Sequence, residues 1–371
     1  MDHYLDNAAT TRVCPEAAQA ALHAMLEEYG NPSSTHTLGR KARALLESSR
    51  AAVAQALGAA SPSEVLFTSC GSESDNLAIL SGAESMKRQG RHILSSLAEH
   101  DAVRRSLDLL EAQGYEITRL RPDATGRISP DSVAAALRED TVLVSLMMVN
   151  NETGAVTDIA AVSRLLKSAG SRALLHTDAV QAFRKIPFQA RSLGADLISV
   201  SGHKIHAPKG IGALYIRPGL RLAPRIVGGS QESGLRAGTE PLPQIAAFAA
   251  ACALDPQTDR IRSLKDLARR LIAEKVPEAR FIETEAPHIL NLSLPGWRSE
   301  VLMNFLESKS VYVSKSSACK QGRRSHVLEA IGLPPRVIDG ALRLGFSRMN
   351  SEDDVAALAE ALAEARGLAH R

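Results

Sequence analysis

The stretch Asp196–Gly210, DLISVSGHKIHAPKG, decides the fold because a short strand in it ends beside a lysine. Its first half is apolar and β-branched, which predicts a buried strand. The run breaks at a Ser-Gly pair, and Lys204 follows closely. In an open α/β sheet, ligands bind beside the carboxyl ends of the strands. Burial there lowers the pKa of a lysine, and a neutral amine can form a Schiff base with an aldehyde cofactor. A loop lysine can equally be a solvated surface charge.

Other short apolar runs extend this interpretation along the chain. Helical patterns fall between most of them, which favours a doubly wound, mostly parallel sheet of seven strands and therefore an α/β fold class. Too few residues join the last two runs for a helical crossover, so these two strands are predicted to be antiparallel. The seven predicted strands are 64–69, 92–96, 115–120, 141–149, 173–178, 196–201 and 212–217. The main predicted helices between them are 72–89, 101–113 and 159–168.

The character of the sequence changes near residue 254, where an Ala-rich helix gives way to DPQTD (255–259). We expect a large domain over 15–254 and a smaller α+β C-terminal domain over 255–371. Residues 1–14 are expected to pack with the small domain. Ser351 and Asp354 predict a capping-box start for the final helix.

The composition excludes several classes of protein. Apolar residues make up 44% of the chain and charged residues 23%, as in ordinary globular proteins. A net charge of +3 with only 4% aromatic residues gives no support for nucleic-acid binding. No apolar run reaches the ~20 residues of a membrane span, and the N-terminus does not resemble a secretory signal. We therefore expect a cytoplasmic protein with no direct nucleic-acid or membrane partner.

One cysteine is predicted to be reactive. The four cysteines are widely spaced and form no CxxC pair, which argues against disulfides and structural zinc. Cys319 lies among small polar residues, with four basic side chains between residues 315 and 324. Nearby cations lower the pKa of a thiol and enrich the nucleophilic thiolate. Cys252, inside FAAACAL, is predicted to be an inert buried thiol, and Cys14 and Cys70 have no comparable basic surroundings.

Further polar groups follow other predicted strands. The small residues of FTSCGSE (67–73) open a helix and could seat a phosphate, or form an ordinary turn. Asp178 could bind a pyridinium nitrogen or cap a helix. His100 could stack on a planar cofactor or be structural. Asn151 brings an amide to the same edge. Arg343 could hold a substrate carboxylate, although an internal salt bridge is favoured by its local sequence.

A metal site is not expected. His203 and His206 are spaced i, i+3, but no third ligand lies near them, and the prolyl loop that follows disfavours a helical pair.

Taken together, ten motifs in one order resemble the cysteine desulfurases of the NifS/IscS type, in the class V, fold-type I aminotransferase superfamily. The resemblance covers residue 4 to about residue 350. The motifs are YLDNAATT (4–11), GNPSSTH (30–36), FTSCGSESDNLAI (67–79), EH (99–100), VNNETG (149–154), HTDAVQ (176–181), SGHK (201–204), RAGT (236–239), SSAC (316–319) and Arg343.

The resemblance implies a pyridoxal 5'-phosphate enzyme that converts L-cysteine to L-alanine and holds the sulfur as a persulfide on Cys319. Lys204 would form the Schiff base and move protons, while His100 stacks over the ring. Asp178 would pair with the ring nitrogen and Gln181 with the ring hydroxyl. The remaining implied site residues are Gly71, Ser72, Ser201 and His203 at the phosphate, Thr239 reaching it from the other subunit of a homodimer, and Asn31, Asn151 and Arg343 around the substrate. Asn151 is implied to bind the cofactor as well.

The chain departs from the family pattern at three positions. Cys70 stands where the family usually has glycine, and Ser72 where it has threonine, so the hydroxyl is kept. Lys315 replaces a small residue, and our hypothesis is that it lowers the pKa of Cys319. The segment 319–326 is slightly shorter than in long-loop members, which bears on delivery of sulfur to an acceptor.

Two alternatives stay open beside a desulfurase that supplies iron–sulfur cluster assembly or thiolation through an acceptor protein. One is a lyase for selenocysteine or a modified cysteine, in which Cys319 is less essential. The other is a non-catalytic scaffold that keeps the fold to bind a partner. The presence of Lys204, Asp178, His100 and Cys319 disfavours the scaffold.

Overall fold

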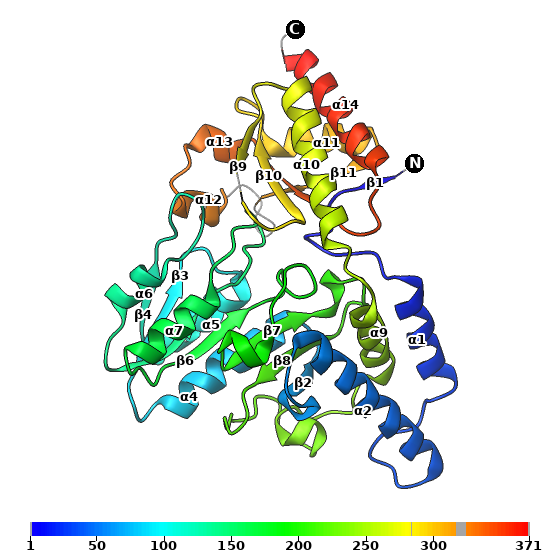
Figure 1. The fold of residues 1–371 in the computed structure, drawn as a ribbon, viewed down its shortest axis with the longest axis vertical. Helices are drawn as coiled ribbons and strands as arrows, with labels where there is room; N and C mark the ends of the chain where they lie inside the picture. The colour runs from blue at the N-terminus through cyan, green and yellow to red at the C-terminus, as the bar shows by residue number, and fades with distance from the viewer. Residues whose placement is uncertain (1, 283, 317–323, 370–371) are drawn as a thin grey trace.

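The centre of the molecule is a seven-stranded sheet (Figure 1). The computed structural model describes residues 2–282, 284–316 and 324–369. The strand order is β2-β8-β7-β6-β5-β3-β4. Only β8 is antiparallel to its neighbours, β7 and β2, which confirms the predicted mostly parallel sheet and the antiparallel β7–β8 pair. The strands are β2 (Val65–Thr68), β3 (His92–Ser96), β4 (Glu116–Leu120), β5 (Thr141–Ser145), β6 (Leu174–Asp178), β7 (Leu197–Ser201) and β8 (Gly212–Ile216).

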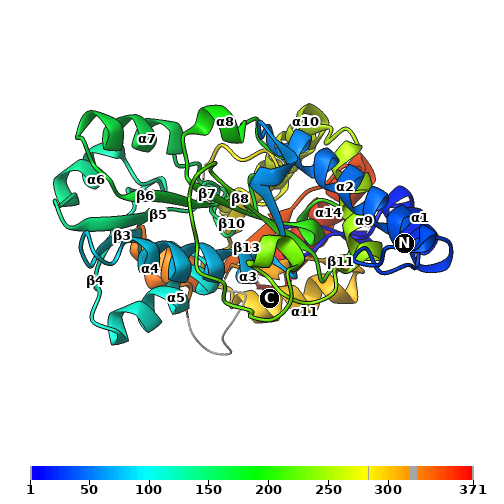
Figure 2. The same cartoon turned by 90° about the horizontal axis from the view of Figure 1, so that it is seen from below.

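Helices cover both faces of this sheet, which explains why its central strands are apolar runs rather than alternating ones. Figure 2 shows α7 and α8 on one face and α4 and α5 on the other. Every residue of β3, β5, β6 and β7 is buried. The helices of this part are α1 (Pro15–Leu26), α2 (Thr37–Leu57), α3 (Gly71–Asn76), a π turn (Leu77–Ser81), α4 (Gly82–Met86), α5 (Asp101–Ala112), α6 (Pro130–Ala136), α7 (Ile159–Ser168), α8 (Ala190–Leu193) and α9 (Leu242–Ala253), with short 3-10 turns at Pro62–Glu64, Gly202–Lys204 and Gln231–Gly234.

Two of the strands and helices predicted above differ from the structure by more than one residue at an end. The helix predicted over 72–89 begins at Gly71 and is interrupted by the π turn. The strand predicted over 141–149 ends at Ser145. Residues 146 and 148 still donate backbone hydrogen bonds to the carbonyls of His176 and Asp178 (3.1 and 3.0 Å), so the chain continues beside β6 without a regular ladder.

A second, antiparallel sheet lies over the carboxyl ends of β5, β6 and β7, at the top of Figure 1. Its order is β12-β13-β10-β9, and a separate apolar core packs it against α10, α11 and α14. The elements are β9 (Arg280–Ile282), β10 (Ile289–Ser293), β12 (Ser314–Lys315), β13 (Ala341–Gly345), α10 (Thr258–Lys275), α11 (Ser299–Ser308), α12 (His326–Ala330), α13 (Pro335–Asp339) and α14 (Glu352–Ala369).

The start of the chain also belongs to this upper part. Strand β1 (His3–Tyr4) pairs in parallel with β11 (Val311–Tyr312), and Leu5 is buried in the core around the second sheet. The boundary predicted near residue 254 falls between α9 and α10, and the division into domains stays a prediction. Ser351 precedes α14, and its N–H donates to the Asp354 carboxylate (2.9 Å), as a capping box requires. Within the described residues, no helix combines the length and apolar character needed to cross a membrane.

Candidate active site

Lys204 lies where the sequence predicts, directly after β7 at the carboxyl edge of the sheet. Its Nζ donates hydrogen bonds to the carbonyl oxygens of Ala8 (2.7 Å) and Ala9 (2.6 Å). Burial lowers the pKa of Lys204 to about 7, and the Arg343 guanidinium adds to this lowering, while Asp6 and Asp178 oppose it. About half of an amine with this pKa is uncharged, and therefore nucleophilic, at pH 7.

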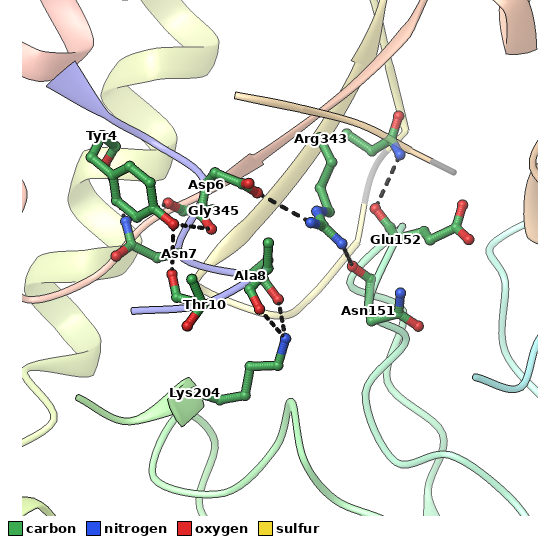
Figure 3. A network of polar contacts seen from close by, with 12 residues as sticks. Tyr4, Asp6, Asn7, Ala8, Thr10, Asn151, Glu152, Lys204, Arg343 and Gly345 are labelled. Carbon is green, nitrogen blue, oxygen red and sulfur yellow. Dashed lines mark hydrogen bonds and ion pairs between the residues drawn. The ribbon is translucent and has the colours of Figure 1, made fainter. Parts of the chain in front are cut away.

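Those carbonyls belong to a short segment that we call the N-terminal strap, residues 5–10, which runs between Lys204 and β13 (Figure 3). Gly345 on β13 donates to the Leu5 carbonyl (2.6 Å) and accepts from the Asn7 backbone (3.2 Å). The Asn7 side chain donates to the same Gly345 carbonyl (2.9 Å). Backbone pairing with β13 therefore sets the position of the two acceptors of Lys204.

Arg343 is 2% exposed and points from β13 toward the same space (Figure 3). Its Nη2 contacts the Asp6 carboxylate (3.1 Å), and its Nη1 donates to the Asn151 carbonyl (3.0 Å). The internal salt bridge favoured by the local sequence is thus present. The Nε atom has no hydrogen-bond partner in the described part of the chain. Arg343 and Lys204 place two basic side chains beside one strap.

Asp178 ends β6, next to β7, and is buried. Burial raises the pKa of its carboxyl, and the buried Asp75 carboxyl raises it further. One oxygen accepts from the Val180 N–H (2.9 Å). Turns rather than a helix follow β6, so Asp178 is not the helix N-cap that we considered as its alternative. A buried carboxyl of this kind suits a cationic partner such as a protonated ring nitrogen.

The residues predicted to bind the cofactor's phosphate combine small side chains with a hydroxyl that has no hydrogen-bond partner. A Cβ on Gly71 would lie 2.8 Å from the Val180 side chain, so a larger residue at position 71 would clash with it. Ser201 Oγ is buried and has no partner among the described residues. The His203 ring contacts Thr10 Oγ1 (3.2 Å), and burial lowers the pKa of His203 to about 3. Ser72 is exposed in the first turn of α3.

His100 and Gln181 occupy defined positions at the same edge. His100 is the N-cap of α5, where its Nδ1 accepts from the Ala102 N–H (3.1 Å), so a structural role and a stacking role are compatible. Gln181 is buried three residues after Asp178 and donates to the Ala8 carbonyl (2.8 Å). The strap therefore joins Gln181 to Lys204 through one shared acceptor.

Two predicted residues do not join this group within one chain. Asn31 is exposed in the loop between α1 and α2, which projects at the lower right of Figure 1, and its side chain accepts from Ser33 N–H (2.9 Å). Thr239 is exposed in the loop before α9. The outward position of both loops fits the expectation that Thr239 serves another copy of the chain.

The predicted sulfur acceptor Cys319 lies outside the described residues. Lys315, on β12, is described and is paired with Glu300 (3.1 Å) on α11. The proposed effect of Lys315 on the pKa of Cys319 stays a prediction. Cys252 is buried on α9, and burial raises the pKa of its thiol, as expected for an inert cysteine. Cys70 is partly exposed as the N-cap of α3.

Sequence reasoning missed several groups that shape the site. Neither Asp6 nor the carbonyls of Ala8 and Ala9 received a role, although they lie within the YLDNAATT motif. Lys185 and His288 were also missed, and both contact Gln181 Oε1. The i, i+4 spacing from Gln181 could have indicated Lys185, whereas no sequence signal points to His288.

Comparison with known proteins agrees with this arrangement. The aminotransferase class-V family model matches residues 3–358. Cysteine desulfurase IscS of Methanosarcina thermophila is 39% identical over 370 residues, covering 97% of this chain and 91% of the relative. A solved NifS-like protein superposes with a TM-score of 0.93 at 35% identity, covering 99% of this chain and 100% of its own. A structure described as SspA in complex with cysteine has a TM-score of 0.82 at 32% identity, covering 95% of this chain and 100% of its own. The chain therefore belongs to the aminotransferase class-V family, among its NifS/IscS-like cysteine desulfurases.

Proposed function

We propose that this chain binds pyridoxal 5'-phosphate, converts L-cysteine to L-alanine and keeps the sulfur as a persulfide on Cys319. The observation that carries the proposal is the juxtaposition at one sheet edge of a lysine with a pKa of about 7, a buried carboxyl and a buried guanidinium. A nucleophilic amine can bind an aldehyde cofactor, and a guanidinium can bind an amino acid's carboxylate.

The residues present fit this cofactor. Lys204 would hold its aldehyde carbon, Asp178 its ring nitrogen and Gln181 its ring hydroxyl, with His100 over the ring. The side-chain-free backbone of Gly71 at the start of α3 and the unpartnered hydroxyl of Ser201 suit a phosphate group. The other proposed phosphate contacts are Ser72, His203 and Thr239 of the partner subunit, which makes the proposed active unit a homodimer. When bound, pyridoxal phosphate withdraws electron density from the substrate's α-carbon.

The substrate would lie between Lys204 and Arg343. Arg343 would hold the α-carboxylate, helped by Asn151 and by Asn31. Asp6 keeps the guanidinium oriented, because its carboxylate pairs with the buried Arg343 Nη2 at 3.1 Å. Lys204 Nζ, near its own pKa at neutral pH, would take the proton from the α-carbon and return a proton to the product.

Sulfur transfer would then involve only the enzyme thiol and the substrate. The Cys319 thiolate attacks the substrate sulfur, an S–S bond forms, and the bond between sulfur and the substrate's β-carbon breaks. The β-carbon keeps the electron pair and takes a proton to become the alanine methyl group. Enzyme thiol and L-cysteine thus give enzyme persulfide and L-alanine, so this step needs no external oxidant or reductant. The persulfide would pass to an acceptor protein, either an iron–sulfur scaffold or a thiolation enzyme.

The visible absorption spectrum tests the cofactor and the substrate together. A band that appears with pyridoxal phosphate, changes on adding L-cysteine and is absent in Lys204→Ala supports the proposal. A band that L-cysteine leaves unchanged refutes the substrate, and no band at all favours the scaffold alternative. L-alanine is quantified in the same samples.

The position of the persulfide is tested by trapping it with an alkylating agent and mapping the peptides by mass spectrometry. We expect the modification on Cys319 and its loss in Cys319→Ser, while the matched variant Cys70→Ser keeps it. A persulfide on Cys70 would contradict the proposal. The lyase alternative is tested by comparing selenocysteine and L-cysteine as substrates of the wild type and of Cys319→Ala. A wild type that prefers selenocysteine, together with a Cys319→Ala variant that turns over selenocysteine but not L-cysteine, would support the lyase.

A further inference from the structure

The amide of Gln181 has one defined orientation. Its Nε2 lies 2.8 Å from the carbonyl oxygen of Ala8, which also accepts from Lys204 Nζ at 2.7 Å. A carbonyl oxygen can only accept, so Gln181 must present its nitrogen to Ala8 and its oxygen to the opposite side. The amide nitrogen has two hydrogens, and the bond to Ala8 uses one of them.

His288 and Lys185 hold the other side of this amide. His288 Nε2 lies 3.2 Å from Gln181 Oε1, and Lys185 Nζ lies 3.5 Å from the same oxygen. Because an amide oxygen only accepts, His288 must carry its proton on Nε2. His288 Nδ1 is buried without a partner in the described residues. The ring is 0% exposed and uncharged, since burial lowers the pKa of His288 well below its usual value, as do the nearby cations Lys185, Lys265, Lys204 and Arg343.

We propose that His288 is a positioning residue, which fixes the Gln181 amide so that its second N–H hydrogen faces the ring hydroxyl oxygen of the cofactor. The inference rests on the proposed contact between Gln181 and that oxygen. His288 directly precedes β10 of the second sheet, so the second sheet would control a contact made by a residue that follows β6 of the first. His288 would act only through Gln181.

The expected consequence is electrostatic. A hydrogen-bond donor to the ring oxygen stabilises negative charge there, so that this oxygen holds the proton of the neighbouring lysine–cofactor linkage less strongly. Without His288, Gln181 Oε1 keeps only the longer contact to Lys185 Nζ (3.5 Å), so the amide is held less firmly and donates less strongly to the ring oxygen. The linkage then keeps its proton to higher pH. Because His288 is neutral, its replacement changes no charge, and the shift reports the orientation of Gln181.

The test is a pH titration of the visible absorption band of the cofactor-loaded protein without L-cysteine. We expect His288→Leu to raise the midpoint by about one pH unit, the size expected for one hydrogen bond to a charged group. His288→Gln, whose Nε2 can take the position of the imidazole Nε2, should restore the wild-type midpoint. The matched control is His92→Leu, which removes another fully buried histidine, bonded to Thr118 and Thr141 at the amino end of β3.

An unchanged midpoint in His288→Leu overturns the inference, as does an equal shift in His288→Gln, which would indicate packing rather than donation. If His288→Leu does not fold by circular dichroism, His288→Met replaces it in the same comparison. Failure of the proposed function is seen separately. It appears as a wild-type protein that forms no alanine from L-cysteine, whether or not its band titrates as expected.

Discussion

Replacing Gly345 with alanine should displace the N-terminal strap from Lys204. A Cβ at position 345 would lie 2.3 Å from the backbone nitrogen of Ala8 and 2.9 Å from that of Asn7. Contacts below 3.0 Å essentially do not occur for a Cβ, so the strap must move by at least about 0.7 Å, the difference between 3.0 and 2.3 Å. The obstructing atoms are backbone and cannot rotate away.

This displacement acts directly on the acceptors of Lys204. The carbonyls of Ala8 and Ala9 hold Nζ at 2.7 and 2.6 Å, and a shift of this size weakens both bonds. A misplacement of ~1 Å can cost ~100-fold in rate. We therefore expect kcat/KM for L-cysteine to fall by about 100-fold in Gly345→Ala. Overpacking should also cost about 1–3 kcal/mol of stability.

Alanine formation at several L-cysteine concentrations and urea unfolding measure the two effects separately. The matched control is Gly367→Ala in α14, where an added Cβ meets no atom within 4 Å. There we expect unchanged activity and a gain of up to about 1 kcal/mol. Wild-type kcat/KM in a folded Gly345→Ala protein would refute the idea that the strap positions Lys204. A loss of activity equal to the fraction of Gly345→Ala protein that is unfolded would also refute it.

Three further predictions concern charged groups. Glu232→Ala removes the carboxylate that contacts the buried Arg50 guanidinium twice at 2.8 Å. We expect the free energy of unfolding in urea to fall by about 3–5 kcal/mol, and part of this loss to be recovered when Arg50→Met is added. Losses of the two variants that simply add up would contradict this. Burial raises the pKa of Glu99 from 4.5 to about 8, so its contribution to stability falls as pH rises through this range, by at most ~1.4 kcal/mol per pH unit. Glu99→Gln should lack this decline. If the urea midpoints of the wild type and of Glu99→Gln change in parallel between about pH 5 and pH 8, the raised pKa of Glu99 is refuted. Arg343→Lys should lower kcat/KM for L-cysteine by about 10- to 100-fold while the cofactor band is kept, and loss of the band would assign Arg343 to cofactor binding instead.

The sequence predicts the large sheet well because its strands are short apolar runs separated by helical patterns. Lys204 and Asp178 were predicted at the carboxyl edge because Asp178 ends one such run and Lys204 closely follows another. The acceptors of Lys204 were not found, since Ala8 and Ala9 contribute backbone carbonyls that no side-chain pattern marks. The contact of Gln181 with His288 was also missed.

Distance along the chain explains why contacts between side chains, such as that of Gln181 with His288, were not predicted. Asp6 and Arg343 are 337 residues apart, and Gln181 and His288 are 107 apart, so only the pairing of β13 and β10 with distant segments brings them together. Asn31 and Thr239 differ again, because their proposed role needs a second copy of the chain. A single sequence gives such residues only through resemblance to a family.

The position of the strap also has a consequence for biosynthesis. A growing chain on the ribosome can form most of the seven-stranded sheet, including Lys204, before residues 341–345 have been made. Until those residues emerge, the opening segment has no β13 to pair with, and the guanidinium of Arg343 is missing. Domains generally fold in the order of their synthesis. In an enzyme of this design, the lysine is therefore in place well before the residues that hold the strap and the substrate's carboxylate, so chains that stop before residues 341–345 should form no alanine.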